Sequence, residues 1–298
     1  MPTLLALFLI IRPLNVAISG LSILVAAILA APAGVPPFYF TTPVVGAIIS
    51  GMFITAGANV INDLCDIDID RLNRPQRILP SGRLASQTAK ILTIFLFACG
   101  NFFSIFINKI AALIAAGTSL LLLVYSWKLK RQPLLGNLAV SLAAALAFIY
   151  GAVAAHGGEM REGIAGLNAG EGDWRAGIFP ALLAFLFHFG REVIKDIEDQ
   201  IGDHAMQART LPLACGIHAA QIAATIAFVL LLAATCAPFH FGIYGPAYLW
   251  IILPGVHPVL IITIYWLWKN PTPPRMRQLS AVLKADMLVG LAAIYWGK

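Results

Sequence analysis

Apolar segments of about 20 residues recur along the whole chain, separated by short stretches that are polar or rich in proline and glycine. A helix needs about 20 apolar residues to cross the hydrocarbon core of a bilayer. We therefore predict nine membrane-spanning helices, at about residues 13–32, 42–62, 87–106, 109–127, 134–155, 176–195, 216–237, 246–268 and 279–297. The expected fold is all-α, a polytopic membrane bundle that forms a single domain over residues 1–298.

The composition agrees with a membrane protein and excludes a soluble globule. Hydrophobic residues make up 59% of the chain and charged residues 11%, and the mean hydropathy is +0.83. So few charges cannot cover a soluble domain of 298 residues. The net charge of +6 does not indicate a nucleic-acid partner, because the basic residues lie at the ends of spans and not along one polar face.

Lysine and arginine are distributed unevenly between the two sides of the predicted bundle. If the N-terminus is cytoplasmic, the connections after even-numbered spans are cytoplasmic too. The cytoplasmic side then holds sixteen basic residues: Arg12, Arg71, Arg74, Arg77, Arg83, Lys90, Lys128, Lys130, Arg131, Arg191, Lys195, Arg209, Lys269, Arg275, Arg277 and Lys284. The opposite side keeps Lys109, Arg161, Arg175 and Lys298, and we expect the glycine-rich connection 156–177 to be an exposed external loop. This positive-inside bias places the protein in the cell membrane in the orientation assumed.

Acidic residues are concentrated in two segments that both fall on the predicted cytoplasmic side. Residues 62–70 and 191–203 together hold nine of the 14 acidic residues. At about 100° per residue of helix, one face of the first segment collects Asn62, Asp63, Asp66 and Asp70, while Asp68 points away. In the second segment Glu192, Asp196, Asp199 and Asp203 share a face, while Glu198 lies off it and is expected to be solvated or salt-bridged.

So many converging carboxylates repel one another unless some are protonated or a cation binds between them. Hard oxygen ligands without a His or Cys pair favour Mg²⁺, which keeps few protein ligands and is usually completed by substrate phosphate. The pattern therefore predicts a diphosphate substrate that bridges the two acidic motifs through Mg²⁺. Neighbouring basic residues can neutralise the remaining phosphate charge, namely Arg71, Arg74, Arg77, Lys130, Arg131, Arg191 and Lys195.

The longer motifs resemble a known family. The pattern Asn62-Asp63-x-x-Asp66-x-x-x-Asp70, with Arg74-Pro75 and Pro80-Ser81-Gly82 after it, resembles the first signature of the UbiA superfamily of intramembrane prenyltransferases, and Asp199-x-x-x-Asp203 resembles the second. The chain departs from the family at Ile78-Leu79-Pro80, where many members have Pro-Leu-Pro or Pro-Ile-Pro, which weakens a turn and leaves the metal site unaffected.

The resemblance implies nine helices around a central cavity and Mg²⁺-dependent transfer of a polyprenyl group from its diphosphate to a lipophilic acceptor. It implies Mg²⁺ ligands at Asp66, Asp70, Asp199 and Asp203, a catalytic set completed by Asn62 and Asp196, and substrate-binding roles for Asp63 and the seven basic residues above. The implied reaction ionises the diphosphate to an allylic cation, which aromatic faces can stabilise. Candidates for this contact are Phe53, Tyr125, Trp127, Phe187 and Phe189.

Within the superfamily, residues 66–75 and 191–199 are most similar to digeranylgeranylglyceryl phosphate synthases, which attach a second geranylgeranyl chain to a glycerol phosphate ether. Related forms of the second motif occur in chlorophyll synthases and homogentisate prenyltransferases, so an aromatic or tetrapyrrole acceptor stays open. The base that deprotonates the acceptor also stays open. Lys284 and Asp286 either lie near an interface or, as charges within the last span, bind an acceptor phosphate.

Other interpretations account for less of the pattern. Helix caps or a solvated acidic loop explain the presence of the carboxylates but not their position on one face of each helix. A CDP-alcohol phosphotransferase begins its motif with Asp-x-x-Asp-Gly, and this chain contains no Asp-Gly dipeptide. A cation-coupled transporter usually binds its ions near the bilayer midplane, whereas these clusters lie at span ends beside arginines.

Overall fold

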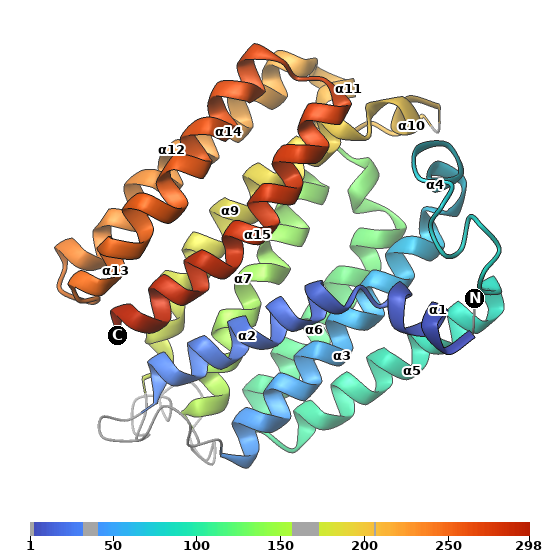
Figure 1. Cartoon of the computed structure of the whole chain (residues 1–298). Helices are drawn as coiled ribbons and strands as arrows, with labels where there is room; N and C mark the ends of the chain where they lie inside the picture. Colours follow the sequence, from blue (N-terminus) through green and yellow to red (C-terminus); the bar gives the residue numbers. More distant parts are fainter. Residues whose placement is uncertain (1–2, 32–40, 157–172, 206) are drawn as a thin grey trace. The chain divides into compact units, whose positions relative to one another are not determined.

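A computed structural model describes residues 3–31, 41–156, 173–205 and 207–298, and in these ranges the regular structure is helical. Figure 1 shows the helices in chain order. The first half contains α1 (Thr3–Ile10), α2 (Pro13–Ala30), α3 (Thr42–Cys65), α4 (Ile67–Asn73), α5 (Ser86–Ile105), α6 (Lys109–Trp127), the 3₁₀ turn η1 (Leu129–Arg131) and α7 (Leu135–Ala155). The second half contains η2 (Trp174–Gly177), α9 (Ile178–Glu198), α10 (Gln200–Ala205), α11 (Leu211–Cys215), α12 (Ile217–His240), α13 (Pro246–Ile251), the π turn η3 (Ile252–Val256), α14 (His257–Lys269) and α15 (Pro273–Gly297).

The nine predicted spans are confirmed within the described ranges. Nine helical stretches are long and apolar enough to cross a membrane, and each overlaps the segment expected from hydropathy. The largest difference is at the last span, which begins at Pro273 and not near residue 279. Proline at the first helical positions is already in a helical backbone conformation, so the helix starts in the polar segment before the apolar run. Residues 157–172 of the predicted external loop lie outside the described ranges.

Many large apolar side chains are exposed on the helices, as lipid contact requires. Examples are Leu4 (80% exposed), Ile94 (70%), Leu113 (72%) and Trp250 (79%). A water-soluble monomer rarely exposes contiguous apolar surface of this extent. These faces are therefore suited to the acyl chains of a bilayer.

The chain forms two compact units. Unit 1 comprises Met1–Trp127 and Leu146–Ala181, and unit 2 comprises Lys128–Ala145 and Leu182–Lys298. The boundary falls inside α7 and inside α9, so each of these two helices contributes residues to both units.

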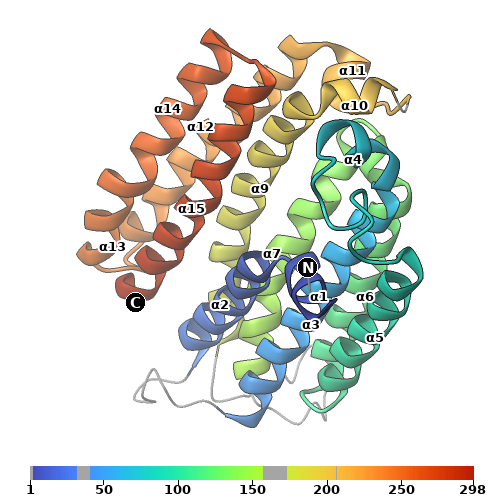
Figure 2. The ribbon, with the colours of Figure 1, turned by 45° about the vertical axis from the view of Figure 1, so that its right-hand side comes forward.

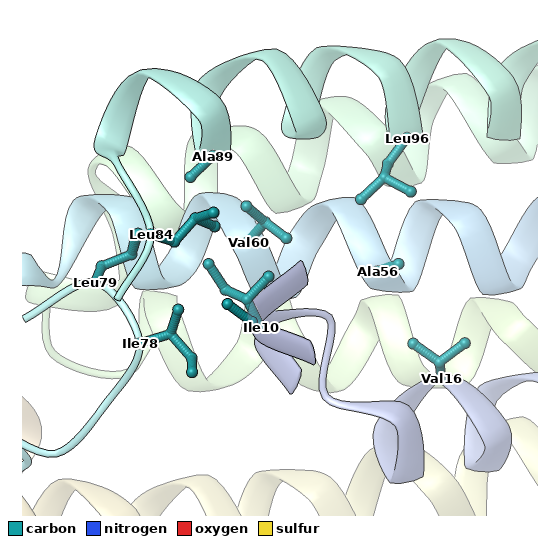
Figure 3. Close-up of a cluster of buried hydrophobic side chains, with 10 residues drawn as sticks. Ile10, Val16, Ala56, Val60, Ile78, Leu79, Leu84, Ala89 and Leu96 are labelled. Atoms are coloured by element: carbon teal, nitrogen blue, oxygen red, sulfur yellow. The ribbon is translucent and has the colours of Figure 1, made fainter. Parts of the chain in front are cut away.

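Unit 1 is built around α3, which packs against α2, α5 and α6. One buried cluster joins the short helix α1 to α3, α5 and the loop that follows α4 (Figure 3). Its members are Ala6, Ile10, Val16, Ala56, Val60, Ile78, Leu79, Leu84, Ala89 and Leu96. Ile78, where the sequence departs from the family pattern, is 7% exposed and lies in this cluster. The isoleucine therefore anchors the loop after the first acidic motif by apolar packing.

Small residues allow close approach of helices in unit 1. A Cβ atom added at Gly151 of α7 would lie 2.1 Å from the carbonyl oxygen of Ile23 in α2. Polar contacts accompany this packing: the Tyr150 hydroxyl donates to Ser50 Oγ at 2.8 Å, and Ser50 Oγ donates to the Gly100 carbonyl at 2.7 Å. Such small-residue contacts and buried hydrogen bonds hold helices together in lipid, where the hydrophobic effect does not.

We expect Gly151→Ala to destabilise the protein by about 1–3 kcal/mol, because the added methyl group must displace the α2 backbone. The matched control is Gly117→Ala in α6, where an added Cβ atom meets no other atom within 4 Å. The control should be neutral or slightly stabilising, since alanine favours a helix over glycine. Thermal unfolding of both variants in detergent provides the measurement, and equal unfolding temperatures would contradict the close α2–α7 contact.

Unit 2 contains α12, α14 and α15, which pack side by side, with α13 and the π turn η3 also against α15 (Figure 2). Gly190 of α9 approaches α12 closely, since an added Cβ atom would lie 2.5 Å from Phe228 Cε1. The guanidinium of Arg191 donates from Nε to the Ser280 carbonyl of α15 at 3.2 Å. The end of α9 that carries the second acidic motif is therefore fixed to both α12 and α15.

Candidate functional site

The first acidic motif, residues 62–70, occupies the end of α3 and the first part of α4. Helix α3 ends at Cys65, and Asp66 leaves helical geometry with φ −103° and ψ 4°. The hydrogen-bond ladder nevertheless continues, because Asp66 N donates to Asn62 O at 3.1 Å and Asp70 N donates to Asp66 O at 2.7 Å. The predicted extension of the span is therefore present, with a local break at Asp66 that the helical pattern did not reveal.

This continued helix separates the carboxylates as the phasing predicts. Asp63 and Asp70 are 5% and 2% exposed, and Asp66 is partly exposed. The Asp68 side chain is 66% exposed and pairs at 2.8 Å with Arg71, whose side chain is 63% exposed. Asp66 is thus the carboxylate of the inner face whose surface remains accessible.

A chain of ion pairs connects the buried carboxylates of unit 1. Arg77 Nη1 lies 2.6 Å from Asp70 Oδ2 and 3.5 Å from Asp63 Oδ1. Arg12 also pairs with Asp63. Asp63 therefore holds two guanidinium groups, from segments on either side of it in the sequence. The sequence had assigned Arg12 to membrane topology alone, and nothing in its local pattern indicated this contact.

Polar groups of α3 also hold the junction between α1 and α2. Arg12 has a left-handed backbone conformation (φ 55°), which breaks the helix at this point. Asn59 Nδ2 donates to the Ile11 carbonyl at 2.8 Å, and Asn15 Nδ2 donates to Asn59 Oδ1 at 3.3 Å. Asn59 lies one helical turn before Asp63, so consecutive turns of α3 bind the junction and direct Arg12 toward Asp63.

The surroundings of the Asp70 carboxyl group shift its pKa in opposite directions. Burial raises its pKa above the ordinary value, Arg77 lowers it through charge and hydrogen bonding, and the neighbouring Asp66 and Asp63 carboxylates raise it. The net direction is upward. Such mutual repulsion among acidic groups is relieved when a cation binds.

The second motif repeats the local structure of the first. Helix α9 ends at Glu198, and after Asp199 the chain turns into α10. Asp199 N donates to Lys195 O at 2.9 Å, and Asp203 N donates to Asp199 O at 3.1 Å, so the ladder again continues through the break. Asp203 is 9% exposed and Asp199 is partly exposed. Each motif thus has one partly exposed aspartate at the break and one buried aspartate a turn later.

The other polar residues of this segment have partners within unit 2. Asp196 Oδ2 accepts a hydrogen bond from Asn137 Nδ2 of α7 at 2.8 Å. Glu192 pairs with Lys195 at 2.7 Å and with Arg191 at 3.2 Å. In this structure the two basic side chains that the sequence assigned to substrate are therefore paired with Glu192.

Glu198, which lies off the shared face of the second motif, is buried and forms an ion pair. It is 7% exposed and pairs with Arg277 of α15 at 3.0 Å. Of the two expectations for Glu198, solvated or salt-bridged, the structure shows the second. Arg277 was not connected with the motif by the sequence, because the two residues are 79 positions apart.

The remaining predicted residues are distributed over both units. Asn62 is partly exposed, Arg74 follows α4 as its C-cap, and Arg71 lies on the exposed side. Lys130 and Arg131 form most of η1, and Arg209 N donates to the Arg131 carbonyl at 3.0 Å. The structure therefore places the first motif with Arg71, Arg74 and Arg77 in unit 1, and the second motif with Lys130, Arg131, Arg191 and Lys195 in unit 2.

The aromatic candidates differ in exposure. Phe187 is 8% exposed, and Phe53 stacks on Phe103 with 6.0 Å between ring centroids. Trp127 is 77% exposed. An indole that faces outward belongs to a lipid-contacting or interfacial position, so Trp127 is not suited to contact a buried cation.

The donor set fits Mg²⁺. In the part of the chain that the structure describes, no three His, Cys, Asp or Glu side chains are grouped so that they alone could hold a metal ion. Mg²⁺ does not require such a group, because it is usually bound by one or two carboxylates plus substrate phosphates and water. The partly exposed Asp66 and Asp199 present the hard oxygen atoms that this ion prefers.

Comparisons with known proteins agree with this chemistry. The UbiA prenyltransferase family matches residues 19–285. A digeranylgeranylglyceryl phosphate synthase of Methanopyrus kandleri is 34% identical over 282 residues, which cover 95% of this chain and 95% of the relative. A solved structure of digeranylgeranylglyceryl phosphate synthase has a TM-score of 0.73 and 28% identity, covering 100% of this chain and 99% of the other. A UbiA homolog from Archaeoglobus fulgidus bound to GPP and Mg²⁺ has the same fold, with a TM-score of 0.66, 20% identity, and coverage of 97% and 99%.

Proposed function

The chain belongs to the UbiA prenyltransferase family, and from this premise we propose that it transfers a geranylgeranyl group from geranylgeranyl diphosphate to geranylgeranylglyceryl phosphate in ether-lipid synthesis. It is an integral-membrane prenyltransferase with nine apolar spans in its described ranges. The observation that carries the choice of acceptor is the similarity over nearly the whole chain to synthases named for that product. Both acidic motifs of the chain fall within the matched region.

We propose that Asp66, Asp70, Asp199 and Asp203 hold Mg²⁺ together with the diphosphate. Bound there, Mg²⁺ supplies positive charge that stabilises the departing diphosphate. Asn62 and Asp196 complete the catalytic set, and the hydrogen bond from Asn137 fixes the orientation of Asp196.

The basic residues of the proposal have distinct tasks. Arg77 orients Asp70 and reaches Asp63 through one terminal nitrogen, and its guanidinium has further N–H groups to donate to phosphate oxygens. Asp63 acts on the substrate through Arg77, which it holds together with Arg12. The other proposed phosphate ligands are Arg71, Arg74, Lys130, Arg131, Arg191 and Lys195, and pairing with Glu192 holds the last two near the second motif.

The proposed orientation puts both motifs on the cytoplasmic side of the cell membrane. Its support is the distribution of lysine and arginine, with sixteen on that side and four on the other. A prenyl diphosphate then enters from the cytoplasmic leaflet, with its head group at the polar surface and its chain among membrane lipids. At the same end of unit 2 the buried Glu198 pairs with Arg277, whose side chain is 57% exposed.

Purified protein given geranylgeranyl diphosphate and Mg²⁺ should prenylate geranylgeranylglyceryl phosphate in preference to homogentisate or a chlorophyllide. Its activity should fall to background when EDTA removes divalent cations, because the diphosphate then lacks its counter-charge. Product formation measured by mass spectrometry across this acceptor panel provides the test.

Each alternative function predicts a different experimental result. Turnover confined to the aromatic or tetrapyrrole acceptor would refute the choice of acceptor and keep the family reaction. Cation flux in proteoliposomes without any prenylated product would refute the enzymatic proposal. Geranyl and farnesyl diphosphates offered in parallel establish which chain length the enzyme prefers.

A further inference from the structure

One carboxyl group stands apart from the other acidic side chains in the structure. Of the eleven acidic residues in the described ranges, ten have a hydrogen-bonding, ionic or electrostatic partner. Within the same ranges Asp286 has none, and its Oδ2 atom is enclosed without a hydrogen bond. Asp286 is 4% exposed and lies near the middle of α15.

Asp286 belongs to unit 2 and lies on a side of α15 whose neighbouring buried positions are apolar. Leu283 and Ala293, on the same side of α15, are 0% exposed. Helix α15 packs against the π turn η3, and Gly255 of this turn comes so close that an added Cβ atom would lie 2.7 Å from Val289 Cγ1. Val289 is one helical turn after Asp286, and π turns inside α-helices are often found at functional sites.

An unpaired carboxyl group inside a membrane span is costly to keep. A buried polar group without a partner costs about 1–3 kcal/mol, and an unpaired charge costs more. Ionisable residues persist in spans where they serve a function. The position of Asp286 therefore indicates a task that requires a carboxylate not committed to a cation.

Binding the phosphate of the acceptor does not fit this task, because a carboxylate repels phosphate. Accepting a proton does fit. Four of the other buried carboxylates are less suited, because a neighbouring arginine or lysine stabilises the charged form and makes the group a weaker base. Asp63, Asp70, Glu192 and Glu198 all have such a cationic neighbour.

We propose that Asp286 accepts the proton from the acceptor hydroxyl group, an inference that rests on the proposed function. In this step the C1–O bond of the prenyl diphosphate breaks and its electron pair leaves with diphosphate. The acceptor oxygen forms a bond to C1, and its O–H proton passes to the Asp286 carboxylate and from there to water. Capture of the cation and loss of the proton together give a neutral ether oxygen.

The test compares Asp286→Asn with a control in the neighbouring helix. Thr263 of α14 is 1% exposed, and its hydroxyl oxygen is likewise enclosed without a hydrogen bond. If Asp286 accepts the proton, Asp286→Asn should lower kcat by about 10²-fold or more while both KM values stay within a few fold. The variant should unfold at the wild-type temperature or above it, because it loses a buried carboxyl group. Thr263→Val should also be at least as stable as wild type and keep its kcat.

A second measurement separates ionisation from proton removal. Oxygen-18 in the bridging position of geranylgeranyl diphosphate moves to non-bridging positions when the C1–O bond breaks and re-forms. Asp286→Asn should retain this exchange, and Asp286→Glu should recover part of the turnover. Wild-type kcat in Asp286→Asn would overturn the proposal, as would loss of the exchange or of thermal stability. Wild-type protein without transfer to any hydroxyl acceptor would instead refute the proposed function itself.

Discussion

Asp66→Ala and Asp199→Ala should each lower prenyl transfer by about 10³-fold or more while leaving the protein folded. Each removes the partly exposed aspartate at the break between a long helix and a short one. Because these carboxylates have accessible surface, their loss leaves no large cavity and should change the unfolding temperature little. Steady-state turnover with geranylgeranyl diphosphate over a Mg²⁺ titration measures the loss of activity. Excess Mg²⁺ should restore the activity only in part.

The matched control for these variants is Asp68→Ala, within the same motif. The Asp68 side chain is 66% exposed and pairs with Arg71 at the surface, a contact worth about 0–1 kcal/mol. We expect its turnover to stay within about twofold of wild type, because a surface substitution of this kind leaves the metal ligands in place. A large loss of activity in Asp68→Ala, or full activity in Asp66→Ala, would contradict the division of the motif into an inner and an outer face.

The spans could be predicted from sequence because the bilayer imposes a simple constraint. Lipid provides no hydrogen-bond partners, so each span must be a helix, and the thickness of the hydrocarbon core sets its length. The helical period then predicted which acidic residues share a face, and the burial of Asp63 and Asp70 beside the exposed Asp68 agrees with it. These predictions depend only on residues close together in the chain.

The contacts that hold the carboxylates depend on residues far apart, and the sequence did not predict them. Arg12 and Asp63 are 51 positions apart, Asn137 and Asp196 are 59 apart, and Arg277 and Glu198 are 79 apart. Any of several arginines on the predicted cytoplasmic side satisfies the positive-inside pattern equally well. The choice of Arg12 follows from the break between α1 and α2, where Asn59 binds the Ile11 carbonyl.

The Asp286 carboxyl shows a different limit of sequence reasoning. Hydropathy places Asp286 in the last span, and from the sequence either a nearby interface or an acceptor phosphate could explain it. Only the structure shows that the group is buried and without a hydrogen bond in the described ranges. A specific role for an ionisable residue in a span can therefore be proposed once its partners are known. Because Asp286 has no cationic partner in the described ranges, proton transfer explains the residue better than charge balance does.

Arg77→Leu should both destabilise the protein and lower turnover on the order of 10³-fold, as loss of an arginine that binds transferring phosphate does in other enzymes. The Asp70 side chain is 3% exposed and would lose the guanidinium that lies 2.6 Å away. Breaking a fully buried pair costs about 3–5 kcal/mol, and because the Arg77 side chain is 24% exposed we expect roughly 2 kcal/mol. Thermal or denaturant unfolding in detergent measures this loss, and Arg71→Leu, which removes the exposed partner of Asp68, should cost less than about 0.5 kcal/mol.

A double-mutant cycle separates the ion pair from other effects of the substitution. Asp70→Asn removes the charge that Arg77→Leu leaves unpaired, so the double variant should be more stable than the sum of the single losses predicts. The expected coupling is about 1–2 kcal/mol, within the range for contacting residues. A coupling near zero would show that Arg77 and Asp70 do not stabilise one another, and Arg77 would then act on the diphosphate alone. A coupling of the expected size together with the loss of turnover would show that the guanidinium holds a metal ligand in place as well as neutralising substrate charge.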